Sequence, residues 1–207
     1  KLSSAFIVAN EIFDAFACEL VYTKENVLEQ GFVNNHKIEF QVCNDEKIIN
    51  HCKKYQITKG EVGTGYKTFI DNICANIKKF EFVTFDYGDK YPRNDFSTRI
   101  YSKHNVHPLF EDDLNLEQLY QTADITYDVN FQHLIDIFES FNVQKCEYKT
   151  QLKALVDFGI IELLEILKEK AGENIYLRET QKVKTLLEPT GMGDRFKMLN
   201  IRRKVKT

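Results

Sequence analysis

The sequence contains no tryptophan, only three prolines and two methionines, and nine glycines among its 207 residues. So little proline and glycine excludes a collagen-like or low-complexity chain. The hydrophobic content of 43% and the charged content of 29% are ordinary for a globular protein and exclude a disordered one. At this length the chain can form one large domain or two small ones.

An excess of charge of one sign is also missing. The chain has 28 Lys and Arg against 31 Asp and Glu, which gives a net charge of −3 and a pI of about 6.0. Nucleic-acid-binding domains usually carry a strongly basic surface. We therefore do not expect nucleic acid as the main ligand.

Long apolar runs and paired cysteines are absent as well. No stretch approaches the ~18 apolar residues of a membrane span, and Glu11, Asp14 and Glu19 occupy the region where a signal peptide would be apolar. The five cysteines are odd in number and include no C-x-x-C pair, which argues against a disulfide framework and a zinc ribbon. We expect a soluble chain with reduced thiols and no membrane partner.

Apolar periodicity predicts strands that alternate with helices. Strands are expected at 5–9, 82–85, 143–148 and 196–201, a hairpin at about 30–45 with its turn at Asn34-Asn35, and helices at 66–79, 131–141, 150–172 and 173–188. Thr150 is expected to cap the third helix, which pauses at Gly159 and stops at Gly172. Residues 53–65 are predicted to be a polar loop, and residues 89–128, which lack a clear period, a long loop excursion. The alternation indicates an α/β fold with a mostly parallel sheet.

Polar residues follow two of the predicted strands. In open α/β sheets, ligands collect beyond the carboxyl ends of the strands. Asn10, Glu11 and Asp14 follow the first strand, and Asp86 follows the second. Grouped carboxylates can bind a guanidinium group through charge-assisted hydrogen bonds, or can accept a proton from a nucleophile. Two structural interpretations stay open, a helix cap at Asn10 and a plain strand-ending turn at 86–88.

Recognised cofactor and metal motifs are not found. His104, His107 and His133 lack the spacing of a helical metal pair, and no cysteine lies near enough in the sequence to complete a site. We expect no metal centre. The sequence also has no P-loop, no G-x-S-x-G motif and no complete G-x-G-x-x-G motif.

Six segments occur in one order along nearly the whole chain, namely IVANEIFDAF (7–16), FDYG (85–88), IYSKH (100–104), DITYDVNF (124–131), TQLKALVDFGI (150–160) and LLEPTGMGDRFKML (186–199). Their order and spacing resemble the MidA family of class I-like methyltransferases, which includes the mitochondrial complex I assembly-factor methyltransferase. The resemblance implies a Rossmann-like class I fold, with residues 1–207 as the C-terminal portion of a single domain. Only the later strands would be present, with an inserted hairpin at about 30–45 and a loop excursion at about 89–128.

The resemblance also implies a reaction. A methyl group would pass from S-adenosyl-L-methionine to a side chain of an acceptor protein, arginine in the mitochondrial members. The implied catalytic residues are Glu11, Asp14 and Asp86, the implied cofactor-binding residue is Asn10, and the implied substrate-binding residues are Tyr87, His104, Asp124 and Thr126. The family's Gly-rich cofactor loop lies upstream of the N-E-x-x-D-A motif and is not found in this sequence.

The sequence departs from the family pattern at two positions and leaves other functions open. Asp128 and Asn130 stand where the family usually has His and Asp, so no role is assigned to them. A retaining glycosidase would need an eight-stranded barrel and a second Glu at another strand end. The main alternative is a non-catalytic binding or assembly module with a methyltransferase-like fold. We expect a cytoplasmic location in a bacterium and a mitochondrial one in a eukaryote.

Overall fold

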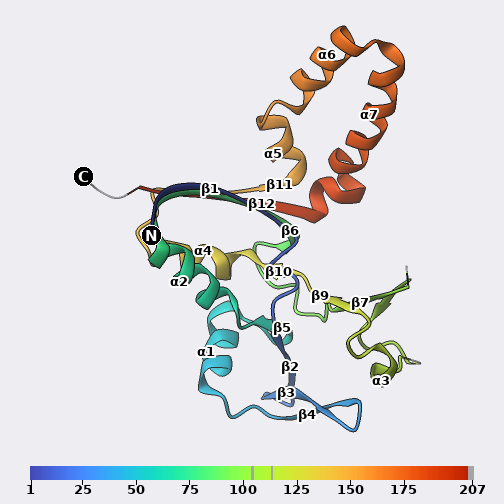
Figure 1. Cartoon of the computed structure of the whole chain (residues 1–207). Helices are drawn as coiled ribbons and strands as arrows, with labels where there is room; N and C mark the ends of the chain where they lie inside the picture. Colours follow the sequence, from blue (N-terminus) through green and yellow to red (C-terminus); the bar gives the residue numbers. More distant parts are fainter. Residues whose placement is uncertain (104, 113, 205–207) are drawn as a thin grey trace.

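The computed structural model describes residues 1–103, 105–112 and 114–204. At its centre lies a five-stranded sheet (Figure 1), made of β1 (Leu2–Asn10), β6 (Ile77–Asp89), β12 (Phe196–Arg203) and β11 (Lys145–Thr150) in spatial order, with β10 (Val129–Asn130) beside the end of β6. β1 and β10 run parallel to β6, whereas β12 is antiparallel to β6, and β11 is antiparallel to β12.

The sheet is therefore mixed, and the prediction of a mostly parallel sheet is wrong. Residues 196–201 of β12 are all buried, so their apolar pattern records burial on both faces and not strand direction. Direction is set by the route of the chain between strands, which no local pattern encodes.

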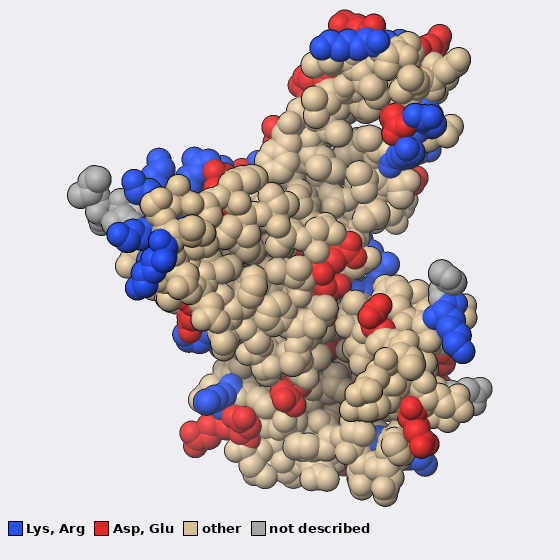
Figure 2. All heavy atoms as spheres, in the orientation of Figure 1, with Lys and Arg blue, Asp and Glu red and all other residues tan. Residues whose placement is uncertain are grey.

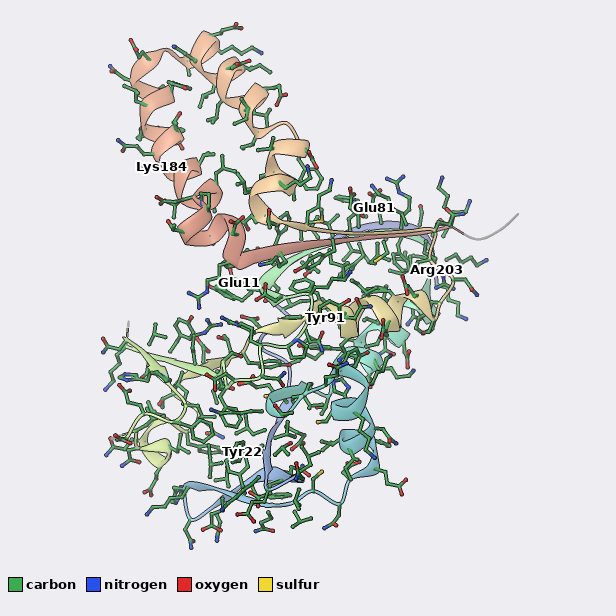
Figure 3. The ribbon with its side chains drawn as sticks, turned by 180° about the vertical axis from the view of Figure 1, so that it is seen from behind. Glu11, Tyr22, Glu81, Tyr91, Lys184 and Arg203 are labelled. Carbon is green, nitrogen blue, oxygen red and sulfur yellow. The ribbon has the colours of Figure 1, made fainter. Side chains whose placement is uncertain are left out.

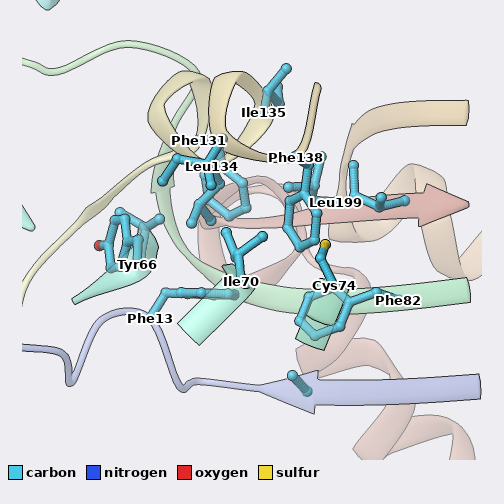
Figure 4. Close-up of a cluster of buried hydrophobic side chains, with 14 of the residues drawn as sticks. Phe13, Tyr66, Ile70, Cys74, Phe82, Phe131, Leu134, Ile135, Phe138 and Leu199 are labelled. Carbon is cyan, nitrogen blue, oxygen red and sulfur yellow. The ribbon is translucent and has the colours of Figure 1, made fainter. Parts of the chain in front are cut away.

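Two helices cover one face of the central sheet, α2 (Tyr66–Asn76) and α4 (Phe131–Glu139) (Figure 1). All five apolar residues of α4 are buried, because they recur at helical spacing on the side that faces the sheet. Figure 4 shows Phe131, Leu134 and Phe138 from α4 close to Ile70 from α2 and Phe82 from β6. This cluster is the main hydrophobic core.

A second, antiparallel sheet is inserted between β1 and α2. Its strands are, in spatial order, β4 (Lys37–Val42), β3 (Val27–Asn34), β2 (Cys18–Lys24) and β5 (Lys59–Gly63), and α1 (Glu46–Tyr55) precedes β5. The predicted hairpin is present as β3 and β4. Its turn residues are Asn35 and His36, both with positive φ, so the turn lies one residue later than predicted.

The predicted loop at 53–65 is wrong, because α1 ends inside it and β5 occupies its second half. β5 has the sequence KGEVG, whose single large apolar residue gives no period to recognise. The strand forms because it pairs with β2, from Cys18 opposite Gly63 to Tyr22 opposite Lys59.

The segment 89–128 is also more regular than predicted. It contains a three-stranded antiparallel sheet and a short helix, with β8 (Asn105–Pro108), β7 (Arg99–Ser102) and β9 (Asp124–Thr126) in spatial order, and α3 (Leu116–Leu119) between β8 and β9. Strands of three or four residues are too short to show an alternating pattern.

Residues 151–193 form α5 (Gln151–Asp157), α6 (Ile160–Ala171), α7 (Glu173–Leu187) and the short π-helix η1 (Pro189–Gly193). We call residues 160–187 the helical arm, because Figure 1 shows α6 and α7 projecting away from the sheet. The predicted helix stops at Gly159 and Gly172 are confirmed by positive φ angles of 86° and 81°. The Thr150 side chain accepts a hydrogen bond from the Lys153 N–H, as expected for a helix cap. Every helix in the described part of the chain is too short or too polar to cross a membrane.

Candidate active site

The candidate site lies where β1 and β6 end. The two strands are parallel, with Asn10 opposite Phe85, so the chain leaves both at the same edge of the sheet. Figure 3 shows Glu11 at one end of the sheet and Arg203 toward the other. Asn10, Glu11 and Asp14 therefore lie at and just after the end of β1, where the sequence predicted them. Asp86 lies inside β6, which continues to Asp89, so the predicted strand end at 85 and the turn at 86–88 are wrong.

Asp86 is fully buried and fastens the turn after β1 to the end of β6. Its Oδ2 accepts hydrogen bonds from the backbone N–H groups of Ile12 (3.2 Å) and Phe13 (2.9 Å), and its Oδ1 accepts one from the N–H of Tyr87 (3.0 Å). Burial and the nearby Asp14 raise the pKa of Asp86 to about 7. Both oxygens thus accept hydrogen bonds from the backbone, which favours a positioning role, and the catalytic role implied for Asp86 stays a prediction.

Glu11 is exposed and its backbone is held in an unusual conformation. Its φ is 50°, in the left-handed region, and its N–H donates to the Phe85 carbonyl oxygen at 2.9 Å. Its Oε1 accepts a hydrogen bond from Asn10 Nδ2 at 2.8 Å. Burial and the neighbouring Glu11 carboxylate raise the pKa of Tyr87 to about 12, so Tyr87 stays a neutral phenol beside the acid. A non-glycine residue with positive φ is a feature that clusters at functional sites.

Asp14 is the carboxylate with unused hydrogen-bonding capacity. Its side chain is only 2% exposed, yet its Oδ1 has no hydrogen-bond partner among the described residues. Burial raises the pKa of Asp14, and the Glu11 carboxylate raises it further, while Arg99 acts in the opposite direction. A buried, unpaired carboxylate oxygen needs an explanation, and a ligand that donates a hydrogen bond provides one.

Two arginines that the sequence did not indicate complete the site. The guanidinium carbons of Arg99 and Arg195 lie 5.0 and 5.4 Å from the centre of the Tyr87 ring. Arg99 begins β7, and Arg195 directly precedes β12, whose first residue pairs with Tyr87. Both arginines stand beside or inside the segments that carry the family resemblance, since Arg99 precedes IYSKH and Arg195 lies in LLEPTGMGDRFKML. Their place beside or inside these segments was the only feature of the sequence that could have indicated them.

Asp128 holds Arg99 in place. Its Oδ1 accepts a hydrogen bond from Arg99 Nη2 at 2.8 Å, and its Oδ2 pairs with Arg93. The backbone N–H of Asp128 donates to Ser97 Oγ at 2.8 Å. Asn130, the other position that departs from the family pattern, caps α4 by accepting from the His133 N–H.

Glu61 of β5 fixes the segment just before Arg99. Its carboxylate accepts four hydrogen bonds, from the N–H and the hydroxyl of both Ser97 and Thr98, at 2.6–3.0 Å. The inserted four-stranded sheet therefore sets the position of β7, and β7 carries Arg99 to the site.

The structure places only one of the predicted substrate-binding residues directly in the site. Tyr87 lies within the site. Thr126 is opposite Arg99 in the pairing of β7 with β9, and Asp124 is opposite Tyr101. The Thr126 side chain is half-buried, and Asp124 is exposed. His104 lies outside the described residues.

Gly88 allows the chain to close around the end of β6. Its φ is 134°, and a Cβ at this position would lie 2.2 Å from the Val129 carbonyl oxygen. Only glycine lets β10 pair with β6 at this distance.

Comparison with known proteins supplies a family and a fold. Residues 1–149 match the family described as "Putative S-adenosyl-L-methionine-dependent methyltransferase". A COG1565 superfamily protein from Burkholderia thailandensis, bound to S-adenosyl-homocysteine, superposes with a TM-score of 0.82 at 17% identity over 100% of this chain and 55% of its own. A native structure of a COG1565 superfamily protein from the same organism gives a TM-score of 0.79 at 18% identity, covering 100% of this chain and 57% of its own.

The chain thus spans little more than half the length of these structures, and at this identity they establish the fold alone. The predicted fold class, an α/β methyltransferase fold, is confirmed. No curated protein matches the chain.

Proposed function

The chain belongs to this family of S-adenosyl-L-methionine-dependent methyltransferases, and on that premise we propose that it is the C-terminal portion of an enzyme that methylates arginine in an acceptor protein. The MidA-like segments support the finer assignment. The relation to complex I assembly is part of the same proposal, as is the location, cytoplasmic in a bacterium or mitochondrial in a eukaryote.

The observation that carries the proposal is that two carboxylates, Glu11 and Asp14, follow β1 and lie near enough for the charge of Glu11 to raise the pKa of Asp14. Methyl transfer is an in-line displacement that needs alignment of the acceptor, exclusion of water and a group to receive the acceptor's proton. A guanidinium group is well matched by carboxylates, which accept its N–H groups in pairs. Glu11 is exposed to an incoming side chain, and Asp14 has an unpaired oxygen one turn further on. Tyr87, with Arg99 and Arg195 against its ring, would form the adjacent wall.

The cofactor supplies the methyl group when bound, and the residues at this edge fit one end of it. Asn10 is exposed at the end of β1, and its side-chain amide suits the hydrogen-bonding end of S-adenosyl-L-methionine. β1 is an edge strand of the central sheet and exposes Leu2, Phe6 and Val8 by 59, 69 and 63%. We propose that further parts of the domain, comparable with the remaining length of the matched structures, cover this strand and hold the adenosine.

A non-catalytic binding or assembly module remains the second candidate. The observation that favours it is the helical arm, since α6 and α7, described in full, contain no buried residue. An arm of this kind suits an interaction more than it suits catalysis. The two functions differ in whether Glu11 matters for turnover.

The test replaces Glu11 by Gln in a full-length protein that carries this chain. The variant should keep its affinity for S-adenosyl-L-methionine, measured by calorimetry, and should lose about 30-fold or more in acceptor methylation. Removing one charge from a paired site commonly costs about 2–5 kcal/mol, and about 1.4 kcal/mol corresponds to a tenfold change in rate.

Glu25→Gln is the matched control. Glu25 is also an exposed glutamate with a φ of 50°, but it lies in the turn between β2 and β3. This variant should methylate normally. Methylation by Glu11→Gln within about threefold of wild type would return Glu11 to a structural role and would leave the assembly-module interpretation in place.

A further inference from the structure

The helical arm presents an unusual amount of apolar surface. Leu163 and Ile166 of α6 are 59 and 45% exposed. Other large apolar side chains of the arm are also exposed, namely Ile161, Ile175, Leu177 and Leu186. Figure 2 shows a broad uncharged surface on the arm, between charged side chains near its outer end and the body of the molecule. Soluble proteins rarely gather this much apolar surface unless something binds to it.

One side of α6 is occupied by α7 and the groove between the two helices. Leu164 and Glu165 line this groove together with Tyr176 and Lys184 of α7, and the Lys168 ammonium lies 5.3 Å from the centre of the Tyr176 ring. Helical geometry of 100° per residue puts Glu162, Leu163, Ile166 and Lys170 on a different stripe, and all four side chains are exposed. We call these four residues the outer stripe of α6.

The outer stripe is complementary to itself. Glu162 precedes Ile166 by four residues and Lys170 follows it by four, so an acid and a base stand at equal distances on either side of an apolar centre. If a second α6 lies antiparallel with its Ile166 against the first, each Glu162 meets a Lys170 of the other copy. In this register Leu163 lies opposite the partner's Glu169 and next to the partner's Ile166. Antiparallel helices also place opposite ends of their dipoles together, and residues spaced by four form the ridges of the commonest helix packing.

From this charge pattern, we propose that the occupant of the outer stripe is a second copy of this chain, bound through an antiparallel pair of α6 helices related by a two-fold axis near Ile166. This inference does not depend on the proposed methyltransferase activity. An isologous contact of this kind uses the same patch on both copies, which is what the symmetric stripe provides.

The size of the contact predicts a reversible dimer. A twelve-residue helix is about 18 Å long, and one helix pair of that length buries less than the roughly 800 Å² per partner of a stable complex. We therefore expect association that depends on protein concentration. Because two ion pairs contribute at an exposed contact, association should also weaken as the salt concentration rises.

The test is a charge-swap experiment on a full-length protein that carries this chain, read by sedimentation equilibrium over a wide range of protein concentration. Glu162→Lys and Lys170→Glu should each weaken dimerisation at least about tenfold, because each variant creates two like-charge pairs across the axis. The double variant restores both pairs in reverse and should dimerise within about threefold of wild type. Circular dichroism checks that every variant stays folded.

Glu165→Lys is the matched control, because it makes the same charge change on the groove side of α6. It should leave dimerisation unchanged. A chain that is monomeric at all concentrations would overturn the proposal, and so would a double variant as weak as either single one. Stronger weakening by Glu165→Lys than by Glu162→Lys would move the contact to the groove and would equally refute the outer stripe.

Discussion

Helices α4 and α6 contain almost the same number of large apolar residues, but these residues differ completely in their burial. In α4 all five are buried, whereas of the six in α6, which the structure describes in full, none is. The apolar residues of α4 form one stripe that matches the face of the central sheet. Those of α6 are spread around the helix, and its neighbour α7 covers only one side. Apolar content therefore does not decide burial; the surface that the neighbouring elements offer does.

The largest expected effect comes from truncating one apolar side chain in each helix. Phe138→Ala in α4 should lower the free energy of unfolding by about 3–5 kcal/mol, because it opens a cavity in a fully buried cluster. Leu163→Ala in α6 should change it by no more than about 0.5 kcal/mol. Urea unfolding at low protein concentration measures both, and similar losses for the two variants would contradict the comparison.

A second pair of variants compares glycines with positive φ in the two regions. Gly88→Ala should lower the free energy of unfolding by roughly 2–3 kcal/mol, because its methyl group would collide with the backbone of Val129. At Gly172, between α6 and α7, an added Cβ has no described atom within 4 Å, so the loss should be smaller than at Gly88 and come from backbone strain alone, since φ 81° and ψ 169° is a conformation that costs other residues about 1–3 kcal/mol. Thermal unfolding of both variants tests the difference. A loss at Gly172 as large as that at Gly88 would show that the arm is more tightly packed than described.

A third comparison concerns the pH dependence that the half-buried histidines and the buried Asp86 impose on stability. Burial, joined by neighbouring positive charge, lowers the pKa of His51 to about 4 and that of His133 to about 3, and their rings meet edge to face with centres 4.4 Å apart. Lys54, Tyr55, Tyr66 and Asp136 surround this pair. Between about pH 6.5 and 4 the unfolded histidines bind protons that the folded ones do not, so stability falls as the pH falls.

Asp86 acts in the opposite sense over the same range. Its folded pKa of about 7 lies above the value near 4 of an unfolded aspartate, so the folded state binds the extra proton and gains stability as the pH falls. The His51→Gln/His133→Gln double variant should therefore lose the acid destabilisation, and Asp86→Asn should increase it. Urea unfolding at pH 7 and pH 4.5 measures both changes, which are opposite in sign and on the order of 3 kcal/mol for Asp86 and up to about 5 kcal/mol for the two histidines together. Identical pH profiles for wild type and both variants would show that these groups do not titrate as argued.

Local sequence predicted those parts of the fold that local chemistry determines. The stops at Gly159 and Gly172, the cap at Thr150, the stripe of α4 and the β3–β4 hairpin each depend on residues close together in the chain. The direction of β12 and the existence of β2, β5 and β7 depend on partners far away in sequence, and short strands carry too little pattern to reveal them.

The candidate site divides in the same way. Its place at the ends of β1 and β6 follows from a general property of such sheets, so Glu11 and Asp14 could be named in advance. That Asp86 would bind the backbone of the turn after β1, and that Arg99 and Arg195 would lie against Tyr87, follows from tertiary packing alone. In a single sequence, residues that make such contacts stand inside or beside motifs, but nothing shows what they contact.

The carboxylate of Glu61 has a mechanical consequence. It attaches the segment Ser97-Thr98 to the inserted sheet through one side chain, and all four hydrogen bonds end on its two oxygens. Because the four bonds share one carboxylate, loss of this single side chain would remove the whole attachment at once. Glu61 thereby connects the inserted sheet to the segment that leads directly into Arg99.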